Sequence, residues 1–284
     1  MEYTIQSDLL QVTVSSVGAE LTSIRYKGEE KLWQNPTGTW AGHSPVLFPV
    51  CGHCGCKVNG KEYPMPAHGV VRKEEFTLVE QEEKRLKFSF SSNEKTKRAY
   101  PFDFVFSVIY QVNGNELSII YDVENPTKTP LWFFCGGHES FNLATDVDGY
   151  KLVFDETEEL VHLAHDGGGY LSGEKVEFGT GKEFVLPVEY LLKGNTIIFG
   201  GIKSGGLYLS KTSGEKVARV EFKDFSNLLL WRPSADAKMI CIEPWLNLPD
   251  LSGQEDVEFS QKAGAVKVDG GQKKTLERKI SYFG

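Results

Sequence analysis

The sequence lacks the marks of several large protein classes. Its 31 Lys and Arg residues are outnumbered by 39 Asp and Glu residues, and the resulting net charge of −8 argues against a nucleic-acid partner, which would favour a basic patch. No apolar run approaches the length of a membrane span. The first residues, Met1 to Thr4, have neither the basic nor the apolar region of a signal peptide. We therefore expect a cytoplasmic protein with no nucleic-acid or membrane partner.

Cysteine is scarce, and its number is odd. At least one of the five cysteines must be unpaired within the chain, which fits free thiols in a reducing compartment. In the segment Cys51-Gly52-His53-Cys54-Gly55-Cys56, two of the three thiols and the imidazole could hold zinc. The Cys-x-x-Cys has no matching second pair, however, because Cys135 and Cys241 are isolated beside apolar strands. We therefore favour a loop that lines a pocket over a zinc site, and expect no metal.

Several catalytic motifs are also missing. The chain has no Gly-x-Ser-x-Gly, no phosphate-binding glycine loop before a helix and no His-Glu-x-x-His. The sequence therefore gives no support for a serine hydrolase, a nucleoside triphosphatase or a zincin. No segment of ten residues shows the 3.6-residue period of a helix, and 187–192 could form one helical turn at most.

A period of two dominates the chain instead. Apolar residues alternate along 102–112, the turn Asn113-Gly114-Asn115 follows, and the alternation resumes along 117–123, which predicts a long hairpin with one buried face. The segments 86–90, 218–222 and 276–282 alternate likewise. A hydrophobic content of 40% can fill a large core, and no linker divides the chain. We predict an all-β fold, a large antiparallel β-sandwich formed by residues 1–284 as a single domain.

A carboxylate stands at the end of one apolar strand. The strand Met239 to Ile242 leads to Glu243 and is expected to stop at Pro244, which cannot donate to a sheet ladder. Trp245 offers a flat apolar face beside the acid. This pattern suits the binding of a sugar ring and proton transfer from its hydroxyls, and the alternative is a surface glutamate that closes a strand.

Two histidines form further candidates. In Gly136-Gly137-His138-Glu139-Ser140-Phe141-Asn142 the glycines allow close approach of a ligand, His138 can exchange protons near pH 7, and Asn142 can bond a hydroxyl. His68 lies in the proline-stiffened loop before the next strand. Nearby, Arg72 is either a ligand-anchoring cation or a solvated surface charge.

Taken in order, these segments resemble the aldose 1-epimerase (galactose mutarotase) superfamily, and its LacX-like branch in particular. The resemblance runs from about residue 4 to the C-terminus, and its main motifs are 17–24, 30–33, 44–50, 59–63 with 66–69, 137–142 and 242–245. It implies the fold of the galactose mutarotase-like supersandwich. It also implies a cofactor-independent isomerase that interconverts the anomers of a hexose.

The resemblance assigns roles to three residues. Glu243 would be the general base that takes the proton of the C1 hydroxyl, and His138 the general acid that protonates the ring oxygen. His68 would bind and polarise the anomeric region. The ring would open, the C1–C2 bond would rotate, and closure on the other face would give the other anomer. We expect a monomer or a homodimer.

This chain departs from the branch at two places. His53 stands where the branch usually has an arginine that holds the sugar, and Asn195 stands where it usually has an aspartate. Both remain candidate substrate-binding residues, and the departures favour, as an alternative, a carbohydrate-binding protein with little or no turnover. A hexose 6-phosphate epimerase is a variant of the first function, and its phosphate would need cations such as Arg72 and Arg232.

Overall fold

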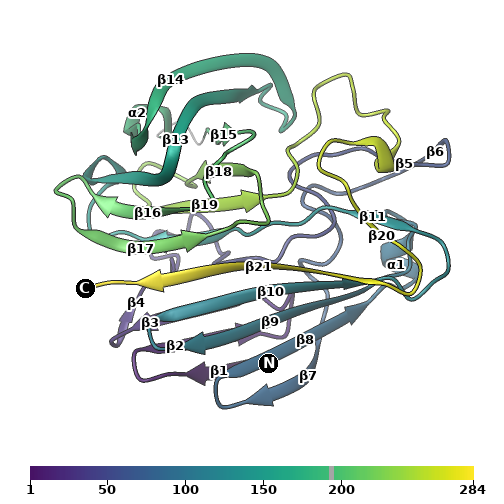
Figure 1. Ribbon diagram of the computed structural model, residues 1–284, viewed down its shortest axis with the longest axis horizontal. Helices are drawn as coiled ribbons and strands as arrows, with labels where there is room; N and C mark the ends of the chain where they lie inside the picture. Colours follow the sequence, from purple (N-terminus) through teal and green to yellow (C-terminus); the bar gives the residue numbers. More distant parts are fainter. Residues whose placement is uncertain (192–194) are drawn as a thin grey trace.

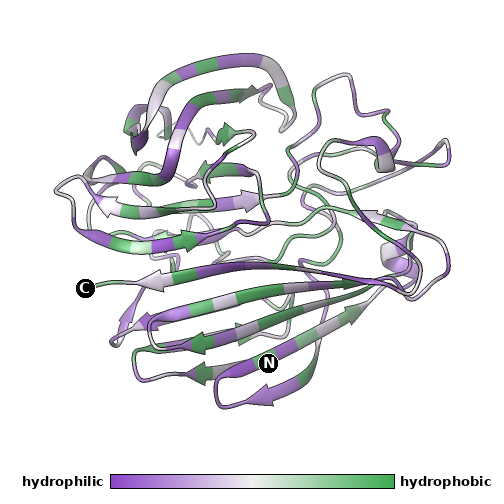
Figure 2. Ribbon diagram, viewed as in Figure 1, coloured by the Kyte–Doolittle hydropathy of each residue, from purple (hydrophilic) through white to green (hydrophobic). Residues whose placement is uncertain are grey.

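The predicted hairpin is present, with the predicted face buried. A computed structural model describes residues 1–191 and 195–284. In it, β9 (Val105–Asn113) and β10 (Glu116–Glu124) pair antiparallel, with Asn113 opposite Glu116. Every second residue from Phe104 to Val112 and from Leu117 to Val123 is buried. Figure 2 shows the matching alternation of apolar and polar bands along these strands.

This hairpin belongs to a 13-stranded sheet that runs through the whole molecule (Figure 1). The order is β12-β19-β18-β15-β13-β16-β17-β21-β10-β9-β8-β7, and β14 pairs with β13. The other members are β7 (Thr77–Glu82), β8 (Arg85–Ser91), β12 (Glu139–Asn142), β13 (Tyr150–His165), β14 (Leu171–Val185), β15 (Ile197–Phe199), β16 (Gly206–Lys211), β17 (Lys216–Glu221), β18 (Asn227–Trp231), β19 (Met239–Trp245) and β21 (Lys273–Tyr282).

A second sheet of four strands covers one part of the larger sheet. It contains β1 (Glu2–Gln6), β2 (Leu10–Ser15), β3 (Leu21–Tyr26) and β4 (Glu29–Glu30). Its apolar residues share one core with those of β8 to β10, and the Tyr110 hydroxyl donates to the Ala19 carbonyl across the interface. The predicted sandwich is therefore confirmed, although its larger sheet extends well beyond the part that the smaller one covers.

The remaining elements are short. Two small antiparallel pairs are formed by β5 (Cys56–Val58) with β6 (Lys61–Tyr63), and by β11 (Leu131–Phe133) with β20 (Val266–Val268). The α-helices are α1 (Glu94–Lys97) and α2 (Val188–Leu191), and the 3-10 turns are 147–149 and 259–261. Within the described residues, neither helix is long and apolar enough to cross a membrane. The helical turn predicted at 187–192 matches α2, except that residue 192 lies outside the described residues.

The strand β19 corrects one prediction. Its expected end at Ile242 is wrong, because the strand continues through Pro244 to Trp245. The missing N–H of Pro244 is tolerated because β12 pairs with β19 only as far as Ile242. The segment beside Pro244 is the irregular chain before β12. Its Gly137 N–H donates a hydrogen bond to the Pro244 carbonyl at 2.9 Å. The extra length carries Glu243 inside the sheet, so the alternative of a surface glutamate is wrong.

A buried ion pair connects β21 to the start of β12 within the 13-stranded sheet. Arg278 of β21 pairs with Glu139, and both side chains are almost fully buried. Arg278 also donates to the Tyr121 hydroxyl at 2.6 Å, and the Ser44 hydroxyl donates to Glu139 at 2.7 Å. Glu139 directly follows His138, so this network fixes the chain from which His138 projects.

We predict that Glu139→Ala lowers the free energy of unfolding by about 3–5 kcal/mol, because it leaves the Arg278 charge buried and unpaired. Urea denaturation followed by tryptophan fluorescence measures the change. The matched control is Glu116→Ala, which removes the partner of Lys279, the half-buried neighbour of Arg278 on β21, at a cost of no more than about 1 kcal/mol. Equal losses in the two variants would contradict a special role for the buried pair.

Candidate active site

A cavity of about 410 Å³ opens where β13, β15, β18 and β19 meet several loops. Glu243 and His138 lie in its wall, together with His53, His68 and Arg72. The lining residues are Trp40, Gly52, His53, Ala67, His68, Arg72, His138, His165, Gly167, Gly169, Thr196, Ile198, Leu229, Trp231, Glu243 and Pro249. Among these residues, Glu243 supplies the sole carboxylate.

Glu243 is held in a dry environment. Its side chain projects from β19 opposite Leu229, and the residue is 2% exposed. Burial raises the pKa of Glu243 to about 8, and the nearby Glu139 charge acts in the same direction. The indole N–H of Trp245 donates to Oε2 at 3.2 Å and opposes this rise. Glu243 is thus a carboxyl group that can gain and lose a proton near neutral pH.

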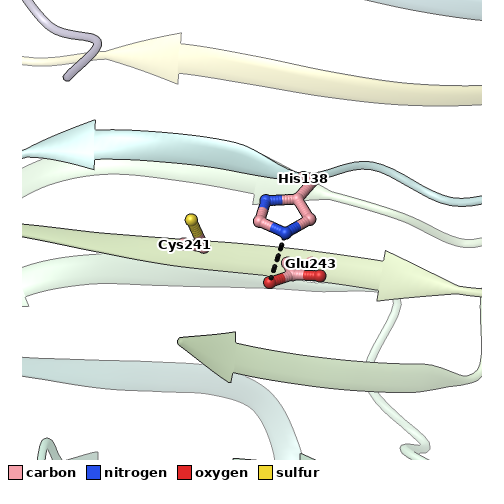
Figure 3. A group of neighbouring side chains, drawn as sticks. All are labelled: His138, Cys241 and Glu243. Atoms are coloured by element: carbon pink, nitrogen blue, oxygen red, sulfur yellow. Dashed lines mark ion pairs between the residues drawn. The ribbon is translucent and has the colours of Figure 1, made fainter. Parts of the chain in front are cut away.

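His138 faces Glu243 directly (Figure 3). Its Nε2 lies 3.3 Å from Glu243 Oε1, and its ring stacks on Trp40 with 5.3 Å between ring centroids. Burial lowers the pKa of His138 well below the usual range, and His68 adds to this effect. Burial thus favours the neutral form of both groups, the protonated carboxyl and the unprotonated imidazole. The Glu243–His138 pair is therefore a compact unit for proton exchange.

His68 stands beside this pair as a neutral donor. Its backbone has a positive φ of 63°, and its Nδ1 accepts a hydrogen bond from the Gly52 N–H at 3.2 Å. Burial, with smaller contributions from Arg72 and His53, lowers the pKa of His68 to about 4. At neutral pH the proton of the ring must therefore be on Nε2, because Nδ1 is an acceptor. His68 can donate from Nε2 to a ligand oxygen.

The two glycines before His138 have a different purpose from the predicted one. A side chain at Gly136 would meet the Trp245 ring at 2.3 Å, and one at Gly137 would meet the Arg278 guanidinium at 2.2 Å. The close approach that they allow is therefore to Trp245 and Arg278 of the protein itself and not to a ligand. It brings β19 and β21 against the chain that carries His138.

Three predicted substrate-binding residues lie elsewhere. Trp245 is fully buried and orients Glu243, so it offers no free face to a sugar. Asn142 is exposed and lines a separate cavity with Lys31 and Tyr150, because β12 carries it away from the His138 end. Asn195 is half-buried, and its neighbour Thr196 lines the cavity in its place.

Only some of the predicted cationic residues reach the cavity. His53 and Arg72 both line the cavity, which places Arg72 beside the site and not on the open surface. Arg232, by contrast, is fully buried, and its Nη1 lies 2.5 Å from Asp146 Oδ1. Its guanidinium is therefore not available to a substrate.

Among the lining residues with aromatic, imidazole or hydroxyl side chains, sequence reasoning missed Trp40, Trp231, His165 and Thr196. Trp40 and Trp231 pack edge to face with their ring centroids 5.3 Å apart, and each also contacts the His138 ring. These tryptophans supply the aromatic wall that the sequence assigned to Trp245. The sequence gave no signal for Trp40, because it lies in a loop. Trp231 carried a signal, because it ends β18, the strand that pairs with β19.

The cysteine loop is divided between the cavity and the core. Gly52 and His53 line the cavity, whereas Cys51, Cys54 and Cys56 are buried free thiols. Within residues 1–191 and 195–284, the sole group of three potential metal ligands is His138, Cys241 and Glu243, whose ligand atoms lie within 4.8 Å of one another (Figure 3). The three thiols of the loop thus form no such group in the described part of the chain.

Comparisons with known proteins find one family model and relatives that match most of the chain. The family model described as aldose 1-epimerase matches residues 1–167. The plasmid-encoded protein LacX of Lactococcus lactis subsp. lactis is 31% identical over 284 residues, with 94% of this chain and 95% of that protein covered.

Two solved structures share the whole fold. One is a galactose mutarotase-like protein from Lactobacillus casei ATCC 334, with a TM-score of 0.92, 25% identity and full coverage of both chains. The other is a galactose mutarotase related enzyme from Lactobacillus acidophilus, with a TM-score of 0.90, 25% identity and coverage of 100% of this chain and 98% of that one. The architecture is thus that of the galactose mutarotase-like β-sandwich proteins. Within this class, the chain belongs to the aldose 1-epimerase family.

The contact between Trp245 and Glu243 yields a test. We predict that Trp245→Phe raises the pKa of Glu243 by about one unit, because it removes a hydrogen bond to the charged carboxylate, a bond worth roughly 1.5–3 kcal/mol. Carboxyl carbon NMR of the protein labelled at glutamate follows the titration. Trp231→Phe, which alters the cavity wall without touching this bond, is the control. An unchanged Glu243 titration in Trp245→Phe would contradict the orienting role of Trp245.

Proposed function

We propose that this protein is an aldose 1-epimerase that interconverts the anomers of a hexose, with Glu243 as general base and His138 as general acid. The contact between Glu243 Oε1 and His138 Nε2 inside the cavity carries the proposal. In a cyclic aldose, the C1 hydroxyl oxygen and the ring oxygen are bonded to the same carbon. A base and an acid that act on these two oxygens must therefore lie side by side, as Glu243 and His138 do.

The chemistry balances within the pair. Glu243 takes the proton of the C1 hydroxyl, the C1–O1 bond becomes a carbonyl, and the bond between C1 and the ring oxygen breaks. His138 gives a proton to the departing ring oxygen. After rotation about C1–C2, the same groups act in reverse as the hydroxyl attacks the other face of the carbonyl.

One proton is shared throughout this cycle. Ring opening starts from ionised Glu243 and protonated His138 and leaves protonated Glu243 and neutral His138, so the proton count of the pair does not change. The short contact between the two groups lets them exchange this proton before the sugar binds. The raised pKa of Glu243 and the lowered pKa of His138 widen the pH range over which the pair holds a single proton.

The surrounding residues suit a sugar. His68 offers an N–H beside the pair, in keeping with its predicted role at the anomeric region. Trp40 and Trp231 present apolar faces next to His138, and such faces pack well against the C–H surface of a pyranose. Thr196 adds a hydroxyl to the wall.

His53 supports a second candidate, a carbohydrate-binding protein with little or no turnover. The side chain lines the cavity at a place where the resemblance predicts an arginine. Imidazole lacks the planar fork and permanent charge of guanidinium, so a weaker hold on the sugar follows. Binding of a hexose without exchange of its anomers would favour this candidate.

We predict that Glu243→Gln and His138→Asn each slow anomer exchange by roughly 10²–10⁴-fold, the usual worth of a positioned proton-transfer group. Saturation-transfer NMR on an equilibrated hexose measures the exchange rate. Glu221→Gln, a change at a half-buried carboxylate on β17, is the control and should exchange at the wild-type rate. A wild-type rate in either site variant removes that residue from the mechanism.

We also predict a bell-shaped dependence of kcat/KM on pH. Activity falls as pH rises through about 8, because Glu243 then loses the last proton of the pair and no acid remains for the ring oxygen. It falls on the acid side as His138 takes a second proton, below the usual range of histidine because burial lowers its pKa. The same NMR measurement over a pH series provides the profile. Activity that increases through pH 8 would show that Glu243 acts as a base without His138 as its acid.

A further inference from the structure

Cys241 lies beside the reacting pair, and the proposed mechanism does not use it. It stands two residues before Glu243 on β19, and side chains two apart along a strand point to the same face of the sheet. One ligand atom from each of Cys241, Glu243 and His138 lies within 4.8 Å of the other two (Figure 3). A thiol, a carboxylate and an imidazole from β19 and the chain before β12 are thus gathered in one place.

The spacing of these groups suits a tetrahedral zinc ion. Zinc binds nitrogen and oxygen at about 2.0 Å and sulfur at about 2.3 Å, so neighbouring ligand atoms of a tetrahedron lie about 3.3–3.5 Å apart. The 3.3 Å between His138 Nε2 and Glu243 Oε1 already equals this separation. Because all three ligand atoms lie within 4.8 Å of one another, a shift of the Cys241 sulfur on the order of 1 Å completes the set.

The contacts around Glu243 and His138 leave ligand atoms of both available. The indole N–H of Trp245 donates to Glu243 Oε2, which leaves Oε1 open, and an outer hydrogen bond of this kind commonly orients a metal-bound carboxylate. The Nδ1 atom of His138 is buried and has no hydrogen-bond partner among the described residues. A buried polar atom without a partner is a place where a bound water or ion is expected. This observation is independent of the spacing.

A divalent cation also balances the charge of such a buried site. In the described part of the chain, His138 is the sole ion-pair partner of Glu243. A thiolate and a carboxylate together carry two negative charges, which one zinc ion neutralises, and buried charges are stable when they are paired or bound to a metal. Magnesium and calcium prefer oxygen ligands, whereas a set of sulfur, nitrogen and oxygen favours zinc.

The cavity gives a cation access to the three side chains. Glu243 and His138 line it, whereas Cys241 is fully buried and lies outside the lining. A cation held by all three would therefore lie at the buried end of the cavity. Its fourth coordination position would face the cavity, where a water molecule or a sugar hydroxyl can enter.

We propose that Glu243, His138 and Cys241 form a zinc site, and that zinc bound there stops anomer exchange because it occupies both groups of the proton-transfer pair. Zinc binding follows from the geometry alone, whereas its effect on exchange rests on the proposed function. The site is separate from the cysteine loop 51–56 that the sequence offered as a zinc ligand set.

The test measures anomer exchange of glucose by saturation-transfer NMR at increasing zinc concentration, with the thiols kept reduced. Exchange should stop as one zinc ion binds per chain. Cys241→Ala should raise the zinc concentration for half-inhibition by at least roughly 100-fold, because loss of even an outer partner of a metal ligand commonly costs 10–100-fold in affinity. The control is Cys56→Ala, which removes a buried thiol of the cysteine loop and should be inhibited like the wild type. Magnesium should not inhibit.

Cobalt(II) gives a second readout that does not depend on catalysis. A thiolate bound to cobalt produces a charge-transfer band in the near ultraviolet. We expect this band in the wild type and in Cys56→Ala, its loss in Cys241→Ala, and a weaker band in Glu243→Gln. Circular dichroism checks that Cys241→Ala is folded. If it is not, Cys241→Ser keeps the side-chain volume and takes its place, and the wild-type and Glu243→Gln spectra need neither variant.

The outcomes separate this proposal from the proposed function. Exchange that zinc leaves unchanged, or equal inhibition of the wild type and Cys241→Ala, overturns the zinc site and leaves the epimerase intact. If glucose is not exchanged at all, the proposed epimerase fails, and cobalt then decides the metal site by itself. A band that requires Cys241 and weakens in Glu243→Gln supports the site. No band in the wild type, or a band that depends on Cys56 instead, overturns it.

Discussion

The close contact between Glu243 and His138 is the interaction around which this site is arranged. Two ionisable groups share a dry end of the cavity, and burial favours the neutral form of both. The arrangement requires a β-strand that continues past a proline, two glycines with no room for a side chain, and an indole that donates to the carboxylate. The buried Arg278–Glu139 pair then anchors the chain that carries His138. These features connect β12, β19 and β21, so the site depends on the large sheet as a whole.

The fold was largely predictable because its signal is local. Alternating apolar residues identified the hairpin at 102–123 and the buried faces of β8, β17 and β21. The segment 276–282 also contained a signal that was not used, because Arg278 lies on the buried face between Leu276 and Ile280. A charged residue at one of the alternating positions that face the core predicts a partner inside the protein. Its identity, Glu139, could not be predicted, because the two residues are 139 positions apart in sequence and lie on strands that are not neighbours in the sheet.

The sequence predicted the proton-transfer residues of the site better than the aromatic residues that line its cavity. The ordered motifs placed His68, His138 and Glu243 together, and the structure brings all three to one cavity. Trp245 and Asn142 were assigned to the sugar because they are neighbours of these residues in sequence. Trp245 does lie on the same face of β19 as Glu243, but its ring packs against Gly136 and is fully buried. Asn142 is exposed because β12 carries it away from the site. The aromatic wall comes instead from Trp40 and Trp231, which lie far from His138 in the sequence.

A crystal structure of the Glu243→Gln variant with a bound aldose tests the central claim most directly, because this variant should hold the sugar without turning it over. The account predicts that the C1 hydroxyl lies within hydrogen-bond distance, about 3 Å, of the side chain at position 243, and that the ring oxygen lies equally close to His138 Nε2. A sugar bound in the same cavity with its anomeric carbon directed away from both groups would contradict it.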